Sequence, residues 1–231
     1  MHFPNKPKGV IFDMDGLLID TIPLYVTAML AASAAVGHPL SQPYICSLTG
    51  LLGQELRDRI VQDCGSAFPI EDFGQATAKH LAVLLDEGAP LKAGAAEILG
   101  YLSSLDIPLA VATSLDTNEA ERYLGHLRQF FRAVVGRDGV QRSKPYPDVY
   151  LKAAALLQLQ PPDCLALEDS FNGIKSAHAA GCMVIMVPDA LMPIEEIKPL
   201  CLGSARDLPY VQALLQRLIE DSGRDWRGLS V

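Results

Sequence analysis

Short apolar runs recur along the chain, and each has the length of a buried β-strand. Stretches with apolar residues at helical spacing separate the last four runs. Strands that alternate with helices form βαβ units, in which the strands lie side by side in a parallel sheet. The pattern therefore predicts an α/β fold built on a parallel sheet with helices on both faces. The expected strands are Val10–Phe12, Leu109–Ala112, Ala133–Val135, Leu165–Leu167 and Met183–Val187.

Amphipathic stretches between these strands are the expected helices of the sheet. Glu119–Phe131 and Asp148–Leu159 each place aromatic or aliphatic side chains on one face. A third stretch, Gly173–Ala180, is followed by Gly181, a residue type that commonly ends helices. We expect these helices to pack on the sheet by their apolar faces.

The segment after the first strand breaks this alternation, because it contains only helical patterns. A run of about seventy residues without a strand is long enough for a separate small domain. We therefore expect a sheet-containing core of residues 1–19 and 92–231 and an inserted all-helical domain of residues 20–91. Proline and glycine residues at both connections suit hinges, so the inserted domain is expected to move. Its expected helices are Leu24–Val36, Gln54–Cys64 and Phe73–Asp86.

Composition and charge narrow the class of protein. The chain has 19 Lys and Arg residues against 27 Asp and Glu residues, a net charge of −8. No basic cluster interrupts this balance, so we expect no nucleic-acid partner and no membrane partner. The 5 cysteines are scattered without a CxxC pair, as in proteins that keep reduced thiols. The N-terminus lacks a signal peptide and no stretch is apolar for long enough to cross a bilayer, so a cytoplasmic protein is expected.

Two carboxylates, Asp13 and Asp15, directly follow the first expected strand. Residues two apart in an extended segment project to the same side, so both can face one reacting centre. Gly16 then allows a tight turn. Two nearby carboxylates repel each other, which raises one pKa unless a cation lies between them. The pair therefore indicates a metal site, a division into acid and base, or both.

Three further positions at or near strand ends carry polar residues. Thr113 and Ser114 follow the second strand, and their hydroxyl and backbone N–H groups can bind phosphate oxygens. Lys144 stands before a proline, and Glu168 and Asp169 follow the fourth strand. Carboxylate ligands suit Mg²⁺, which keeps open water positions and is shared with phosphate. In open α/β folds ligands bind at the carboxyl ends of the strands, so we expect one site there.

These motifs resemble those of the haloacid-dehalogenase-like hydrolase superfamily, in the branch that contains β-phosphoglucomutase and small sugar-phosphate phosphatases. The resemblance covers nearly the whole chain and implies a Rossmann-like core, with the inserted helices as a small cap domain. The motifs are DxDG at Asp13–Gly16, Thr113-Ser114, Lys144-Pro145, and Glu168-Asp169 followed by Gly173.

The resemblance also implies roles for five residues. Asp13 is the nucleophile that attacks phosphorus and becomes an aspartyl phosphate, and Asp15 is the acid and then the base of the two steps. Thr113 and Ser114 bind the phosphoryl oxygens, and Lys144 offsets charge around the nucleophile. Phosphoryl transfer depends mostly on positioning and electrostatic stabilisation, which these residue types supply.

The same resemblance implies Mg²⁺ as the cofactor. Its ligands are Asp13, the backbone carbonyl of Asp15, and Asp169. Glu168 lies close by, either as a further ligand or as a support behind the ligands, and both alternatives stay open.

The reaction is expected to be hydrolysis of a small phosphorylated metabolite. The carbon–halogen hydrolases of this superfamily lack an acid two places after the nucleophile, so Asp15 favours a phosphate ester. In β-phosphoglucomutase a histidine follows the first motif and an arginine lies in a cap loop. The corresponding segments here, residues 20–25 and 48–53, contain neither. A phosphoric monoester hydrolase is therefore expected, with a β-phosphoglucomutase-like phosphomutase and a non-catalytic phosphate-binding protein as alternatives.

The partner is expected to be the phosphorylated metabolite itself, and its identity is not encoded in these motifs. Tyr25, Lys79 and His80 of the inserted domain are candidates for substrate contact or for a structural role. A monomer is expected, with a dimer as the alternative.

Overall fold

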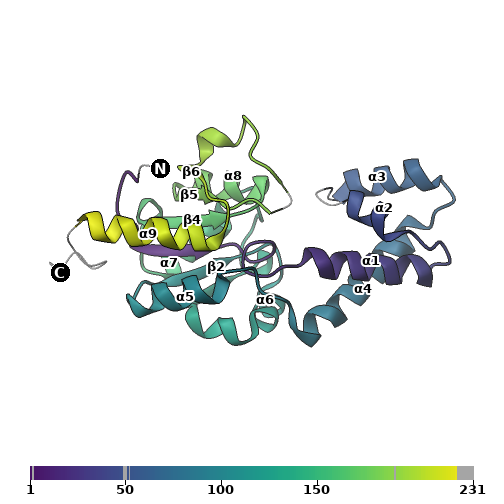
Figure 1. Ribbon diagram of the computed structural model, residues 1–231, viewed down its shortest axis with the longest axis horizontal. Helices are drawn as coiled ribbons and strands as arrows, with labels where there is room; N and C mark the ends of the chain where they lie inside the picture. Colours follow the sequence, from purple (N-terminus) through teal and green to yellow (C-terminus); the bar gives the residue numbers. More distant parts are fainter. Residues whose placement is uncertain (2, 49–50, 52, 190, 223–231) are drawn as a thin grey trace. The chain divides into compact units, whose positions relative to one another are not determined.

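The computed structural model describes residues 1, 3–48, 51, 53–189 and 191–222 of the chain (Figure 1). The chain divides into two compact units, one of Met1–Ile19 and Leu91–Val231 and one of Asp20–Pro90. We call the first the core unit and the second the helical unit.

The core unit contains a six-stranded sheet in the order β3-β2-β1-β4-β5-β6, and every pair of neighbouring strands is parallel. This confirms the predicted α/β fold with a parallel sheet. The strand β6 was not expected, because two residues at a sheet edge are too short to give a periodic pattern. The strands are β1 (Gly9–Phe12), β2 (Leu109–Ala112), β3 (Ala133–Val135), β4 (Cys164–Glu168), β5 (Met183–Met186) and β6 (Gly203–Ser204).

Helices cover the sheet. All residues of β1, β2, β4 and β5 are buried, which requires cover on both faces because side chains alternate along a strand. On one face α7 and α8 pack against Ile11, Ala110 and Ala166. The helices are α5 (Ala95–Ser104), α6 (Thr117–Leu124), α7 (Asp148–Leu156), α8 (Phe171–Ala180) and α9 (Leu208–Ser222), with 3₁₀ segments η1 (Gly125–Phe130), η2 (Arg137–Gly139), η3 (Pro161–Asp163) and η4 (Lys198–Leu200).

Helix ends differ from the sequence expectation where the backbone leaves helical geometry. The expected helix Glu119–Phe131 is α6 followed by η1, because Gly125 has a φ of +50°. The expected helix Asp148–Leu159 ends at Leu156, two residues before Gln158 at a φ of +61°. Helix α8 ends at Gly181 as expected, and its φ of +87° is the left-handed conformation that glycine adopts readily.

The helical unit consists of helices and their connections in its described residues. Helices α1 and α4 contact each other, and residues such as Met29, Ile45, Ile60 and Phe73 form its apolar cluster. Helix α2 was not expected; Ser41 caps it by accepting a hydrogen bond from the Tyr44 N–H. Thr49, Gly50 and Leu52 of the loop compared with β-phosphoglucomutase lie outside the described residues. The helices are α1 (Ile22–Ala35), α2 (Gln42–Ser47), α3 (Gly53–Cys64) and α4 (Ile70–Gly88).

Within the described part of the chain, no helix combines the length and the apolar character needed to cross a membrane.

The strand order places a reversal beside β1. The chain passes from β1 to β2 and β3 on one side and then returns to β4 on the other side of β1. In open α/β sheets such a reversal leaves a crevice at the carboxyl ends of the two adjacent strands, here β1 and β4, and ligands bind in this crevice. Asp13 follows β1 and Glu168 ends β4, so both acidic motifs lie at this point.

Candidate active site

The ends of β1 and β4 bring three carboxylates together. Phe12 pairs with Leu167 in the sheet, and the Asp13 N–H donates to the Leu167 carbonyl at 3.0 Å. Asp13, Glu168 and Asp169 each offer a carboxylate oxygen, and these three oxygens lie within 4.8 Å of one another. The sheet register, which buried apolar residues set, therefore creates the acidic cluster.

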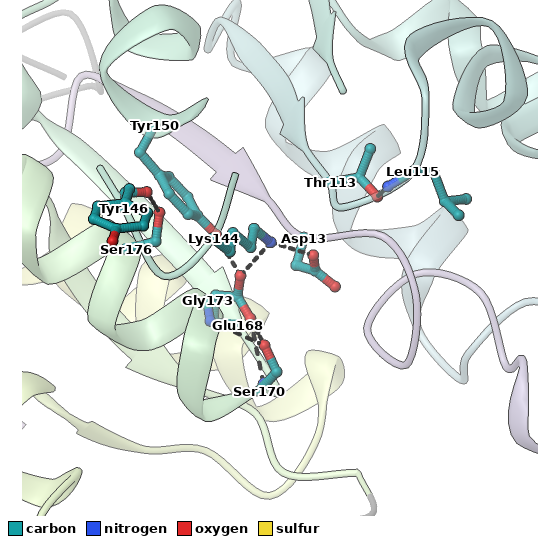
Figure 2. A network of polar contacts seen from close by, with 10 residues as sticks. All are labelled: Asp13, Thr113, Leu115, Lys144, Tyr146, Tyr150, Glu168, Ser170, Gly173 and Ser176. Carbon is teal, nitrogen blue, oxygen red and sulfur yellow. Dashed lines mark hydrogen bonds and ion pairs between the residues drawn. The ribbon is translucent and has the colours of Figure 1, made fainter. Parts of the chain in front are cut away.

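A buried lysine lies between two of these carboxylates. The Lys144 Nζ is 2.5 Å from Asp13 Oδ1 and 2.5 Å from Glu168 Oε1, and its side chain is 3% exposed (Figure 2). Burial alone would lower the pKa of Lys144. The charges of Asp13 and Glu168 outweigh that effect and hold its pKa above the ordinary value. Lys144 is therefore a charged lysine, and its peptide bond to Pro145 is cis.

Glu168 is completely buried, and both of its oxygens are occupied (Figure 2). Oε1 accepts hydrogen bonds from Lys144 and from the Tyr150 hydroxyl at 2.6 Å. Oε2 accepts from the Ser170 N–H at 3.3 Å and from its hydroxyl at 3.0 Å. A carboxylate has about four lone-pair sites, and these contacts use them. The arrangement suits a carboxylate that holds Lys144 and the start of α8 in place.

Asp169 packs closely against the turn that follows Asp13. Gly16 has a φ of +81°, and a Cβ on it would lie only 2.2 Å from Asp169 Oδ2. Burial, and to a smaller extent the charge of Glu168, raise the pKa of Asp169 to about 8, although the charge of Lys144 acts in the opposite direction. Burial also raises the pKa of Asp13 well above its ordinary value, against the effect of Lys144. A divalent cation among these groups would lower both pKa values.

The Asp15 carboxylate has no hydrogen-bond partner among the described residues. Burial raises its pKa to about 6, with Lys144 opposing. Its side chain is not one of the three that lie within 4.8 Å. Asp15 thus has a free carboxyl group next to the cluster, and its backbone carbonyl is the atom that the resemblance assigned to the metal.

The loop after β2 holds Thr113 and Ser114. The Thr113 N–H donates to the Val135 carbonyl at 3.0 Å, which continues the pairing with β3, so this group is not available to a phosphate. The Thr113 hydroxyl oxygen accepts from the Leu115 N–H at 3.2 Å, and its hydrogen can still be donated (Figure 2). Thr113 is buried and Ser114 is exposed. Ser114 therefore presents its donors to solvent from a loop whose flanking residues are fixed.

Sequence reasoning missed several residues that shape this site. Tyr150 reads as part of the apolar face of a helix, and no pattern marks it as a partner of Glu168. Asp189, which follows β5, forms an ion pair with Lys92, with 2.6 Å between Asp189 Oδ1 and Lys92 Nζ. Its charge contributes to the raised pKa of Asp169. The rule that strand ends carry functional residues could have identified Asp189.

The three residues proposed for substrate contact all lie in the helical unit. Tyr25 belongs to α1 and is exposed, as is Lys79 of α4, whereas His80 is partly buried. Their roles remain predictions.

Comparison with known proteins places the chain in a family. Residues 10–187 match the family described as haloacid dehalogenase-like hydrolase. Hexitol phosphatase B of Escherichia coli is 34% identical over 196 residues, which are 81% of this chain and 86% of that protein. The phosphorylated carbohydrates phosphatase of Thermotoga maritima is 30% identical over 176 residues, covering 75% and 82%. The crystal structure of CbbY from Rhodobacter sphaeroides in complex with phosphate has a TM-score of 0.67 and 28% identity, covering 87% of this chain and 95% of that one.

Proposed function

Because this chain belongs to the haloacid dehalogenase-like hydrolase family, we propose that it is a magnesium-dependent phosphatase of a small phosphorylated metabolite. The reaction proceeds through a phosphoryl group carried on Asp13. Two curated relatives are named as phosphatases of a hexitol and of phosphorylated carbohydrates, which supports a sugar phosphate or a similar substrate.

One observation carries the proposal: Lys144 contacts Asp13 within a cluster that also contains Asp169. A carboxylate is a poor nucleophile towards an anionic phosphate unless nearby positive charge offsets the repulsion. A buried lysine and a divalent cation supply such charge at the place where phosphoryl transfer needs it.

The donor set of the cluster fits Mg²⁺. Asp13 and Asp169 offer hard carboxylate oxygens close together, as Mg²⁺ prefers. We assign these two residues and the backbone carbonyl of Asp15 as ligands, and Glu168 as the residue that orients Lys144. When bound, the ion would neutralise charge on the phosphoryl group and on the two carboxylates.

In the first step, an Asp13 carboxylate oxygen forms a bond to phosphorus and the bond from phosphorus to the ester oxygen breaks. Asp15 donates its proton to the leaving oxygen, so the alcohol departs neutral. A positioned general acid contributes about 10²–10⁴-fold. The carboxyl group of Asp15 is partly buried and burial raises its pKa to about 6, which suits this role.

In the second step, Asp15 removes a proton from a water molecule, and the water oxygen forms a bond to phosphorus. The bond between Asp13 and phosphorus breaks, which releases inorganic phosphate and restores both carboxyl groups. Ser114 and the Thr113 hydroxyl bind the phosphoryl oxygens in both steps, while Lys144 stays charged beside Asp13.

The helical unit and the cellular setting complete the proposal. We assign the choice of substrate to the helical unit, acting as a cap, as the resemblance implies. The protein acts as a monomer in the cytoplasm, where reducing conditions keep thiols free. All five cysteines are free thiols, as such a compartment requires.

Phosphate release tests this function. The protein is incubated with Mg²⁺ and a panel of phosphorylated sugars, hexitols and nucleotides, and inorganic phosphate is measured. We expect turnover by the native protein and none by Asp13→Asn, which keeps the size of the side chain but is not a nucleophile. Asp163→Asn, at the opposite end of β4, is the matched control and should keep full activity.

Chemical trapping tests the intermediate. Borohydride reduces an acyl phosphate, so peptide mass spectrometry of a trapped reaction should find homoserine at position 13. If Asp13→Asn turned over substrate as fast as the native protein, Asp13 would not be the nucleophile. Conversion of β-glucose 1-phosphate into glucose 6-phosphate without net phosphate release would favour the phosphomutase instead.

A further inference from the structure

The loop after β2 is fixed by the connection after β3, which we call the clasp and define as Gly136, Arg137 and Asp138. The Arg137 N–H donates to the Leu115 carbonyl at 2.9 Å. The Gly136 N–H donates to the Thr117 hydroxyl at 3.1 Å. These bonds join the clasp to the loop after β2, about twenty residues earlier in the sequence. In both bonds the donor is a main-chain N–H group of the clasp.

Asp138 provides the side chain of this clasp. Its Oδ1 accepts from the Thr117 N–H at 2.8 Å and from the Thr117 hydroxyl at 2.7 Å. Thr117 is the first residue of α6, where N–H groups have no partner within the helix. Asp138 therefore fixes both the start of α6 and the end of the loop that contains Ser114.

Gly136 lets the two segments approach this closely. A Cβ at this position would lie 2.4 Å from the Thr117 nitrogen and 2.5 Å from the Leu115 carbonyl oxygen. Both atoms belong to the main chain, so they could not move aside without shifting the loop. The exposed ion pair of Arg137 with Asp116, at 2.8 and 3.0 Å, adds a further contact across the same junction.

We propose that Asp138 is a positioning residue for phosphate binding, acting through Thr117 on the loop that contains Ser114. The inference rests on the proposed function, because it assumes that Ser114 binds phosphoryl oxygens. Thr113 is anchored to β3 on one side of Ser114, and Leu115 and Thr117 are anchored to the clasp on the other. Ser114 is exposed, so these anchors set the position of its donors.

If Asp138 acted only through its charge, its removal would strengthen phosphate binding instead of weakening it. Asp138 is an anion near a loop that should bind an anion, so its charge alone would weaken phosphate binding. If charge were its only effect, removal of that charge would tighten binding. If position matters, loss of the acceptor would loosen the loop and weaken binding. Asp138→Asn and Asp138→Ala separate these effects, because the amide oxygen of asparagine can still accept both hydrogen bonds.

The experiment measures the Kd of inorganic phosphate by calorimetry in the presence of Mg²⁺, together with KM and kcat. For Asp138→Ala we expect Kd and KM to rise about tenfold, equivalent to about 1.4 kcal/mol, with kcat within about twofold of the native value. Asp138→Asn should stay close to the native protein. Asp163→Ala, which removes an aspartate paired with Lys8 at the far end of β4, is the matched control and should change neither constant.

Each other outcome has a distinct meaning. Tighter phosphate binding by both Asp138 variants would overturn the inference, because it would show that the charge of Asp138 matters and not the hydrogen bonds that it accepts. An Asp138→Ala protein equal to the control would overturn the inference while leaving the phosphatase function intact. A folded native protein that neither binds phosphate nor releases it would overturn both. If Asp138→Ala does not fold, Thr117→Val removes only the hydroxyl between Asp138 and Gly136. Its KM should rise about threefold, and an unchanged KM would overturn the inference.

Discussion

The two halves of the site are organised by different forces. In the carboxylate half, formed by Asp13, Lys144 and Glu168, buried charges hold one another at 2.5 Å. In the half that we propose to bind phosphate, which contains Thr113 and Ser114 and which we call the phosphate half, neutral groups are held by main-chain hydrogen bonds to β3 and to the clasp. A buried charge must be paired or it destabilises the fold, whereas a neutral donor on an exposed loop needs only a fixed backbone.

This difference predicts which kinetic constant each half controls. Substitutions in the carboxylate half should lower kcat, because they remove charge at the reacting centre. Substitutions in the phosphate half should raise KM, because they weaken binding of the phosphoryl group in substrate and transition state alike.

The largest effect should follow from Lys144→Met. This change removes the ammonium group between the buried carboxylates of Asp13 and Glu168, and removal of one partner from a buried pair costs about 3–5 kcal/mol. We expect kcat to fall about 10³-fold and the melting temperature to fall as well. Steady-state kinetics and thermal unfolding measure the two effects. A variant with native kcat would show that catalysis by the carboxylate half does not need Lys144.

Asp15→Asn should lower kcat/KM by about 10²-fold on an alkyl phosphate, as expected for loss of a general acid in the first step. The loss in kcat/KM should be smaller on p-nitrophenyl phosphate, whose leaving group needs no proton. On both substrates phosphoenzyme should accumulate, because the second step, which they share, lacks its base. Comparing the two substrates in one assay measures this. Equal losses on both would argue that Asp15 does not protonate the leaving oxygen.

Gly16→Ala should raise the Mg²⁺ concentration needed for half-maximal activity by about tenfold, because the new Cβ would displace Asp169. Gly181→Ala is the matched control. Gly181 has a φ of +87°, similar to the +81° of Gly16, but a Cβ there meets no atom within 4 Å. Activity is titrated with Mg²⁺ for both proteins. A similar change in both would mean that backbone strain, and not contact with Asp169, causes the effect.

Ser114→Ala should have the smallest effect among substitutions within the two halves, a rise in KM of about fivefold with kcat nearly unchanged, as for loss of one hydrogen bond. Substrate titration at saturating Mg²⁺ measures it. A larger loss in kcat than in KM would place Ser114 with the carboxylate half and would contradict the division between the two halves.

Much of the fold was predictable because it rests on local patterns. The apolar runs that became β1 to β5 carry their own signal, since every residue of these strands except Val134 is buried. The same pattern located Asp13, Thr113, Glu168 and Asp169 at strand ends. Helix α2 was not identified because it is only six residues long, and η1 was taken as part of a helix. Helices α5 and α9 were not identified either, although their buried residues, such as Ile98 and Leu102 or Val211 and Leu215, recur at helical spacing.

The sequence alone determined the type of sheet, the residues at its carboxyl edge and the chemistry that those residue types allow. Tertiary structure alone decided that Tyr150 and Ser170 occupy the oxygens of Glu168, that Lys92 pairs with Asp189, and that the clasp fixes the loop of Ser114. The reason is physical: periodicity reports which face of an element is buried, but a contact between distant segments depends on strand order and helix packing. Those are set by the whole core and not by any segment within it.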